Sequence, residues 1–177
     1  IDIYYFHRDD LETPLDEPLS AMADLVRAGK IRYWGFSNFH AWRIAELVHL
    51  CDSLGMPGPV ATQPCYNVVN RMIELEYLPA CRHYGIGVVP YSPLARGVLT
   101  GKYPVKGDPP PSSRAGRNDP RIFEIEYRKE SLIVAQKMAK RAEKTGMTTG
   151  QFAVNWVLNN GLVSSVITGP RTFDQWQ

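Results

Sequence analysis

The chain has 177 residues, of which 44% are hydrophobic and 21% charged, a composition typical of a globular protein with its own core. Twenty basic and eighteen acidic side chains give a net charge of +2, which argues against a nucleic-acid or membrane-surface role. No apolar run reaches the roughly 18 residues of a membrane span. Three widely spaced cysteines without a CxxC pair argue against a zinc site and favour a reduced, cytoplasmic compartment.

Runs of β-forming residues alternate with helical patterns in the first half of the chain. The predicted strands are residues 1–7, 31–38, 59–63 and 86–92, and the predicted helices between them are residues 15–30, 41–55 and 72–85. Leu19, Met22 and Val26 share one face of the first helix, and Gly29 suits the left-handed position past its end. This alternation indicates parallel strands with right-handed crossovers, in either an open doubly wound sheet or a closed barrel.

Residues 101–124 break the alternation, because their five prolines exclude a single regular element. An irregular segment of this length in a compact domain is often a functional lid. The elements predicted after it are helices over residues 129–145 and 148–161, a fifth strand over residues 162–169, and the start of a further helix over residues 170–177. Thr148 or Thr149 is the expected cap of the second of these helices.

Polar residues stand at the carboxyl-terminal end of one predicted strand after another. These residues are His7, Ser37, Asn38, Gln63, Tyr91 and Ser92. The sequence contains neither GxGxxG, the motif of a dinucleotide-binding doubly wound fold, nor GxxxxGK[ST], the motif of a P-loop fold. Both folds are therefore disfavoured. In a (β/α) barrel the carboxyl-terminal ends of the strands hold the chemistry. We therefore predict that these residues form one site.

Five stretches of the chain resemble one protein family in order and spacing. They are "FHRDD", "VRAGKIRYWGFSNFHAWRIAE", "TQPCYNVVNR", "GIGVVPYSPLARGVLTGKY" and "VSSVITGPRTFDQ". Together they resemble the aldo-keto reductases, (β/α)8 barrels that reduce carbonyls with NADPH. The resemblance implies an α/β fold, a TIM barrel of which this sequence holds about the last five strands. It also implies a single domain over residues 1–177 whose N-terminal part and C-terminal helices lie outside this sequence.

The resemblance assigns roles to the polar residues at the strand ends. His7 matches the family's active-site histidine, which polarises the substrate carbonyl. Ser37, Asn38 and Gln63 match residues that hold the nicotinamide carboxamide, a group with one acceptor and two donors. Tyr91 matches the aromatic residue that stacks on the nicotinamide ring. Alternative roles are a turn and a helix cap for Ser37 and Asn38, and core packing for Tyr91.

The resemblance also implies contacts along the rest of the cofactor. Those along the pyrophosphate are Ser92, Leu94, Arg96 and Gly97. Those in the loop that folds over the cofactor are Lys102 and Arg114. Those around the adenosine are Gly169, Arg171 and Gln175. The Arg171 guanidinium is suited to a 2′-phosphate, which favours NADPH over NADH. The alternative for the basic residues is an ordinary surface charge.

We infer from this resemblance an NADPH-dependent carbonyl reductase that acts on a small aldehyde or ketone. A tyrosine outside this sequence would donate the proton, because carbonyl reduction needs an acid as well as a hydride. The long-loop branch of the family includes the potassium-channel β-subunits, so a non-catalytic, NADPH-binding regulatory subunit is the alternative. Those subunits carry asparagine in place of His7, which favours the reductase. A half-barrel without activity is a further alternative. The sequence does not determine the oligomeric state.

Overall fold

The computed structural model describes residues 1–175, which form two compact units. Unit 1 consists of Ile1–Cys65, Met72–Pro90 and Leu162–Ser165. Unit 2 consists of Tyr66–Arg71, Tyr91–Gly161 and Val166–Gln177. Because chain segments far apart in sequence contribute to each unit, neither unit is a simple half of the chain.

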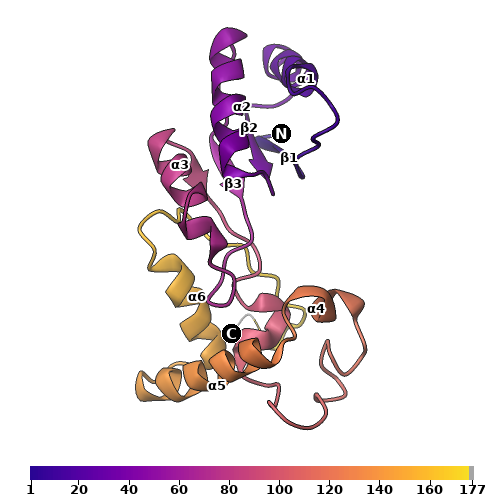
Figure 1. The fold of residues 1–177 in the computed structure, drawn as a ribbon, viewed down its shortest axis with the longest axis vertical. Helices are drawn as coiled ribbons and strands as arrows, with labels where there is room; N and C mark the ends of the chain where they lie inside the picture. The colour runs from indigo at the N-terminus through magenta and orange to yellow at the C-terminus, as the bar shows by residue number, and fades with distance from the viewer. Residues whose placement is uncertain (176–177) are drawn as a thin grey trace. The chain divides into compact units, whose positions relative to one another are not determined.

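Unit 1 is a parallel sheet with helices between its strands (Figure 1). Its elements are β1 (Ile3–Phe6), α1 (Asp16–Arg27), β2 (Tyr33–Ser37), α2 (Ala41–Ser53), β3 (Ala61–Gln63), the 3₁₀ turn η1 (Met72–Glu74), α3 (Tyr77–His83) and β4 (Gly87–Val88). The strand order is β1-β2-β3-β4, and every neighbouring pair is parallel. The predicted α/β fold with parallel strands is confirmed.

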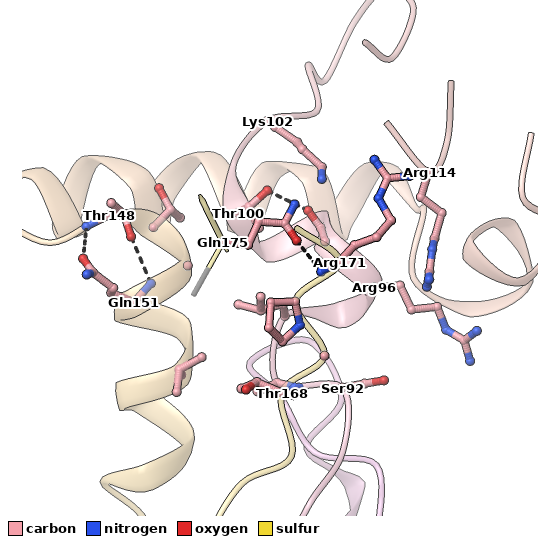
Figure 2. Close-up of a pocket in the computed structure, with 18 of the residues that line it drawn as sticks. Ser92, Arg96, Thr100, Lys102, Arg114, Thr148, Gln151, Thr168, Arg171 and Gln175 are labelled. Atoms are coloured by element: carbon pink, nitrogen blue, oxygen red, sulfur yellow. Dashed lines mark hydrogen bonds between the residues drawn. The ribbon is translucent and has the colours of Figure 1, made fainter. Parts of the chain in front are cut away.

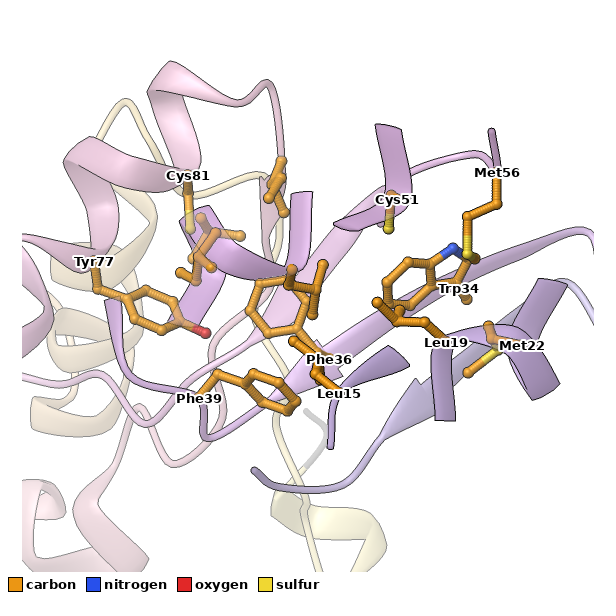
Figure 3. Close-up of a cluster of buried hydrophobic side chains, with 14 of the residues drawn as sticks. Leu15, Leu19, Met22, Trp34, Phe36, Phe39, Cys51, Met56, Tyr77 and Cys81 are labelled. Atoms are coloured by element: carbon orange, nitrogen blue, oxygen red, sulfur yellow. The ribbon is translucent and has the colours of Figure 1, made fainter. Parts of the chain in front are cut away.

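The helices of unit 1 form where apolar residues recur at helical spacing. Leu19 and Met22 of α1 lie in one buried cluster with Trp34 and Phe36 of β2 (Figure 3). Leu47 of α2 belongs to the same cluster. The Trp34 indole donates a hydrogen bond of 2.8 Å to the Pro57 carbonyl, so its polar atom is satisfied inside the core. The predicted inward face of α1 is therefore confirmed.

Two elements of unit 1 differ from the prediction. The helix predicted over residues 72–85 is divided into η1 and α3, with Pro79 in the first turn of α3, where its missing N–H would have no helical partner. The fifth strand predicted over residues 162–169 is, within the described residues, a single parallel bridge between Val163 and Val88. Its partner β4 is short because Pro90 has no N–H to extend the ladder.

Unit 2 is built from helices and irregular segments around its own core. Its elements are η2 (Ala95–Thr100), α4 (Pro120–Ile125), α5 (Lys129–Lys144), α6 (Thr149–Leu158) and η3 (Phe173–Gln175). Thr148 caps α6 in a capping box with Gln151, so one of the two predicted caps is confirmed. Of the helix predicted over residues 170–177, the turn η3 is present, and residues 176 and 177 lie outside the described residues.

The irregular segment after η2 is fixed where it begins. Tyr103 is fully buried, and the Gln136 amide of α5 donates hydrogen bonds of 3.0 Å to the carbonyls of Gly101 and Tyr103. The Tyr103 hydroxyl accepts a hydrogen bond of 3.4 Å from the Ala115 amide. The segment is irregular in backbone shape, and these bonds attach it firmly to α5.

Two of the three cysteines are predicted to resist thiol reagents in the folded protein. Burial raises the pKa of the Cys51 thiol to about 11 and that of Cys81 to about 12. Both groups are therefore protonated thiols at neutral pH, and the thiolate is the reactive form. Alkylation with iodoacetamide followed by peptide mass spectrometry is expected to leave both unmodified until denaturant is added. Rapid labelling of either in the native protein would contradict this expectation.

Candidate functional site

Four of the predicted site residues come together in unit 1. His7 directly follows β1, Ser37 ends β2 and is followed by Asn38, and Gln63 ends β3. The Asn38 amide donates hydrogen bonds of 2.9 Å both to the His7 carbonyl and to the Ser37 hydroxyl. The Ser37 hydroxyl in turn donates to the Gln63 carbonyl. Because parallel strands end at one edge of the sheet, these residues meet there as the sequence predicted.

Asn38 does not cap α2, which was one of its two predicted roles. His40 occupies the N-cap position, and no side chain caps this helix by a hydrogen bond. Asn38 has a φ of 57°, a left-handed conformation that asparagine tolerates better than most residues. Its side chain instead ties β1 to β2 at the strand-end edge.

A buried ion pair supports the loop that follows His7. Arg43 of α2 lies with its Nε atom 3.2 Å from the Asp9 carboxylate, and both side chains are largely buried. Arg43 also contacts the Glu46 carboxylate at 2.7 Å. No role was predicted for these residues, although Asp9 lies within the quoted stretch "FHRDD" and Arg43 within "VRAGKIRYWGFSNFHAWRIAE". The His7 side chain itself is exposed, so a ligand can reach it.

Unit 2 contains an open pocket of about 1290 Å³. Five basic side chains from separate segments line it, and four of them are labelled in Figure 2. They are Arg96, Lys102, Arg114, Arg117 and Arg171. None of the described residues that line this pocket is acidic. Arginine and lysine are the preferred partners of phosphate groups, so the pocket suits an anion with several charges.

The pocket brings together nearly all the predicted residues of unit 2. The predicted residues that line it are Ser92, Leu94, Arg96, Gly97, Lys102, Arg114, Gly169, Arg171 and Gln175. Tyr91 is half-buried beside this set, and its carbonyl accepts a hydrogen bond of 3.3 Å from the Tyr66 amide. The Gln175 side chain accepts a hydrogen bond of 2.7 Å from the Arg171 amide, which fixes the turn that carries Arg171.

The backbone along one wall of the pocket is unusual. Ser92, Ala95 and Arg96 have φ values of 57°, 46° and 53°, and Gly97 has a φ of 97°. A left-handed backbone conformation is energetically unfavourable for residues other than glycine, and such residues cluster at ligand-binding sites. A Cβ atom on Gly97 would lie 3.2 Å from the Lys102 ammonium, so glycine leaves room for that cation. The wall is thus shaped for a close backbone approach to a ligand.

Sequence reasoning missed a residue that holds this wall. Asn67 is fully buried, and its amide donates a hydrogen bond of 3.0 Å to the Ser92 carbonyl. Its side-chain oxygen accepts a hydrogen bond of 3.0 Å from the Val69 amide. The signal was present in the motif "TQPCYNVVNR", where an asparagine follows a strand in a short turn. Arg117 was also missed, and its guanidinium donates a hydrogen bond of 2.6 Å to the Ser112 carbonyl.

Within the described part of the chain, no helix combines the length and apolarity needed to cross a bilayer. Residues 1–177 match the family model described as "Aldo/keto reductase family". The chain is 37% identical over 178 residues to an Arabidopsis thaliana protein named "Probable voltage-gated potassium channel subunit beta", covering 100% of this chain and 54% of that protein. A protein of the same name from Oryza sativa is 38% identical over 177 residues, with 99% and 54% covered.

A third relative is named as an enzyme. The mouse protein "Aflatoxin B1 aldehyde reductase member 2" is 32% identical over 188 residues, covering 99% of this chain and 51% of that protein. The chain therefore spans about half the length of the curated relatives it matches.

Proposed function

Because the chain belongs to the aldo/keto reductase family, we propose that it is part of an NADPH-dependent carbonyl reductase that converts a small aldehyde or ketone to an alcohol. Members of this family generally use NAD(P)H. The observation that supports the proposal most directly is the pocket of unit 2, in which five cations and no described acidic residue form the lining. A dinucleotide with three phosphate groups matches this charge pattern.

The cations of the unit 2 pocket fit the phosphate groups of the cofactor. In unit 2, the residues that would hold its phosphates and adenosine are Ser92, Leu94, Arg96, Gly97, Lys102, Arg114, Gly169, Arg171 and Gln175. By the family resemblance, the residues of unit 1 that would hold the carboxamide are Ser37, Asn38 and Gln63. Tyr91 would pack against the nicotinamide ring. When bound, NADPH supplies the hydride.

The reaction also needs groups that act on the substrate. The exposed His7 imidazole would donate a hydrogen bond to the carbonyl oxygen and so stabilise the negative charge that develops there. We propose that a tyrosine outside residues 1–177 donates the proton. The fold proposed for the whole protein is a (β/α)8 barrel, and its proposed location is the cytoplasm. The organisation of residues 1–177 as a single domain stays a prediction.

Replacing Arg171 by alanine is expected to narrow the preference for NADPH over NADH. Loss of a guanidinium that contacts a 2′-phosphate should weaken NADPH binding by about tenfold and leave NADH binding nearly unchanged. Fluorescence titration of both cofactors gives the two dissociation constants. Arg121→Ala removes an exposed arginine that does not line the pocket and should change neither constant. An unchanged preference in Arg171→Ala would assign the 2′-phosphate contact to Lys102 or Arg114.

A non-catalytic regulatory subunit is the second candidate, because the plant relatives named as potassium-channel β-subunits are 37% and 38% identical to this chain. The two candidate functions differ in whether the protein reduces a carbonyl substrate. We expect the protein to oxidise NADPH in the presence of simple aldehydes or ketones. Tight NADPH binding without turnover of any carbonyl would favour the regulatory subunit.

A further inference from the structure

Two carboxylates bracket α4, and each one contacts a cation of the pocket. Glu126, at the C-cap of α4, lies with Oε2 3.0 Å from Arg96 Nε. Asp119, at the N-cap, lies with Oδ2 3.2 Å from Arg114 Nε. We refer to Asp119 and Glu126 as the α4 carboxylates. Neither belongs to the lining of the pocket, so both would act through the arginines.

The Arg96–Glu126 pair is buried. The Glu126 side chain is 4% exposed and that of Arg96 is 21% exposed. Arg96 Nε and Glu126 Oε2 are both inaccessible to solvent, and within the described residues neither has a hydrogen-bond partner. The ion pair is therefore what compensates the burial of these two atoms, and removing one partner would leave the other charge uncompensated.

The position of Arg96 gives this ion pair a second role. A φ of 53° is unfavourable for arginine, so another interaction must hold the residue there. A guanidinium carries five N–H donors in a rigid plane. The 3.0 Å contact between Arg96 Nε and Glu126 Oε2 restricts where the guanidinium can lie by charge attraction, and its Nη groups are the donors left for a pocket ligand. Glu126 thus sets the direction in which Arg96 presents its charge.

The Asp119 carboxylate makes two separate interactions. Its Oδ1 atom accepts a hydrogen bond of 3.0 Å from the Arg121 amide and so caps α4, while Oδ2 contacts Arg114. Formation of the first turn of α4 is therefore linked to the orientation of Arg114. This pair is less buried than the first, with side-chain exposures of 43% for Arg114 and 32% for Asp119, so it is screened more strongly by solvent.

We propose that the α4 carboxylates are positioning residues, which fix the guanidinium groups of Arg96 and Arg114 for the phosphates of a dinucleotide. The proposal rests on the proposed NADPH-binding function. The negative charge of a carboxylate near the pocket would by itself weaken the binding of an anion. Positioning has the opposite effect, because arginines already held in place lose less freedom when the ligand binds. The sign of the change on removing the carboxylate charge therefore separates the two effects.

Glu126→Gln tests the proposal, with Glu124→Gln as the matched control. Glu124 is an exposed carboxylate of the same helix and does not line the pocket, so its removal changes the net charge equally. We expect Glu126→Gln to weaken NADPH binding by about tenfold. Glu124→Gln should leave it unchanged or slightly tighter. Asp119→Asn keeps a good N-cap residue and should weaken binding by about threefold.

A double variant keeps the test decisive if Glu126→Gln impairs folding. Arg96→Gly combined with Glu126→Gln leaves no uncompensated charge and suits the left-handed backbone, so it should fold. If Glu126 acts through Arg96, the double variant should bind NADPH no more weakly than Arg96→Gly, in which Glu126 keeps its charge without the arginine. A further loss in the double variant, or binding by Glu126→Gln as tight as by Glu124→Gln, would overturn the positioning role. A wild-type protein that binds no NADPH would refute the proposed function itself.

Discussion

Replacing His7 by alanine is expected to lower kcat/KM for aldehyde reduction by about 10²–10³-fold. His7 is exposed directly after β1, and its backbone carbonyl accepts a hydrogen bond from the Asn38 amide, one of the groups that would hold the carboxamide. Without the imidazole, the substrate carbonyl oxygen loses a hydrogen-bond donor at the moment when negative charge develops on it. Steady-state assays of NADPH oxidation with a reactive aldehyde measure this loss.

Two controls make the result specific to the carbonyl. The dissociation constant for NADPH should be unchanged in His7→Ala, because the proposed role of His7 is contact with the substrate. His49→Ala removes an exposed histidine of α2 away from the strand ends and should keep full activity. Wild-type turnover by His7→Ala would contradict the assignment of His7 and would move the search to other donors.

Replacing Gly35 by alanine is expected to destabilise the protein by about 3 kcal/mol, at the upper end of the cost of overpacking a core. A Cβ atom at this position of β2 would lie 2.3 Å from the Ala61 carbonyl oxygen and 2.8 Å from Cε1 of Tyr5. The first obstacle is backbone of the neighbouring strand, which cannot move aside without breaking the ladder between β2 and β3. Urea denaturation monitored by circular dichroism should show a lower midpoint.

Gly58→Ala is the matched control, because a Cβ atom there meets nothing within 4 Å and the residue does not have a left-handed φ. Its midpoint should equal or exceed that of the wild type. The double variant Tyr5→Ala/Gly35→Ala should recover little, since the Ala61 oxygen remains in place. Full recovery in that variant would show that the Tyr5 ring, and not the strand backbone, requires glycine.

The elements that sequence reasoning found are those with a local physical signal. The spacing of Leu19 and Met22 predicts the inward face of α1, and Gly29 marks its end with a φ of 67°. Thr148 with Gln151 marks the start of α6 in the same way. The meeting of His7, Ser37, Asn38 and Gln63 at one edge of the sheet follows from the order of elements, because parallel strands place their carboxyl ends together. Their role in binding stays a prediction.

What was missed depends on contacts between residues distant in sequence. The helix α4 is too short to show a hydrophobic period, and its partners Arg96 and Arg114 precede it in the chain. The side chain of Asn38 was available for capping, and a hydrogen bond to His7, 31 residues earlier, determines where it points. The prediction of a fifth strand was wrong because β4 offers only a short edge for pairing. The β-propensity of residues 162–169 does not by itself extend the ladder.

The hydrogen bonds from Gln136 have a consequence for how this region can evolve. They hold Gly101 and Tyr103 on α5, and the contact of Tyr103 with Ala115 secures the other end of the intervening stretch. Residues 104–114 thus form a closed loop whose ends stay in place whatever its length. Doubling the length of such a loop adds only about 0.6 kcal/mol of closure entropy. Insertions near Gly107 can therefore lengthen this loop while Lys102, which lines the pocket, keeps its place.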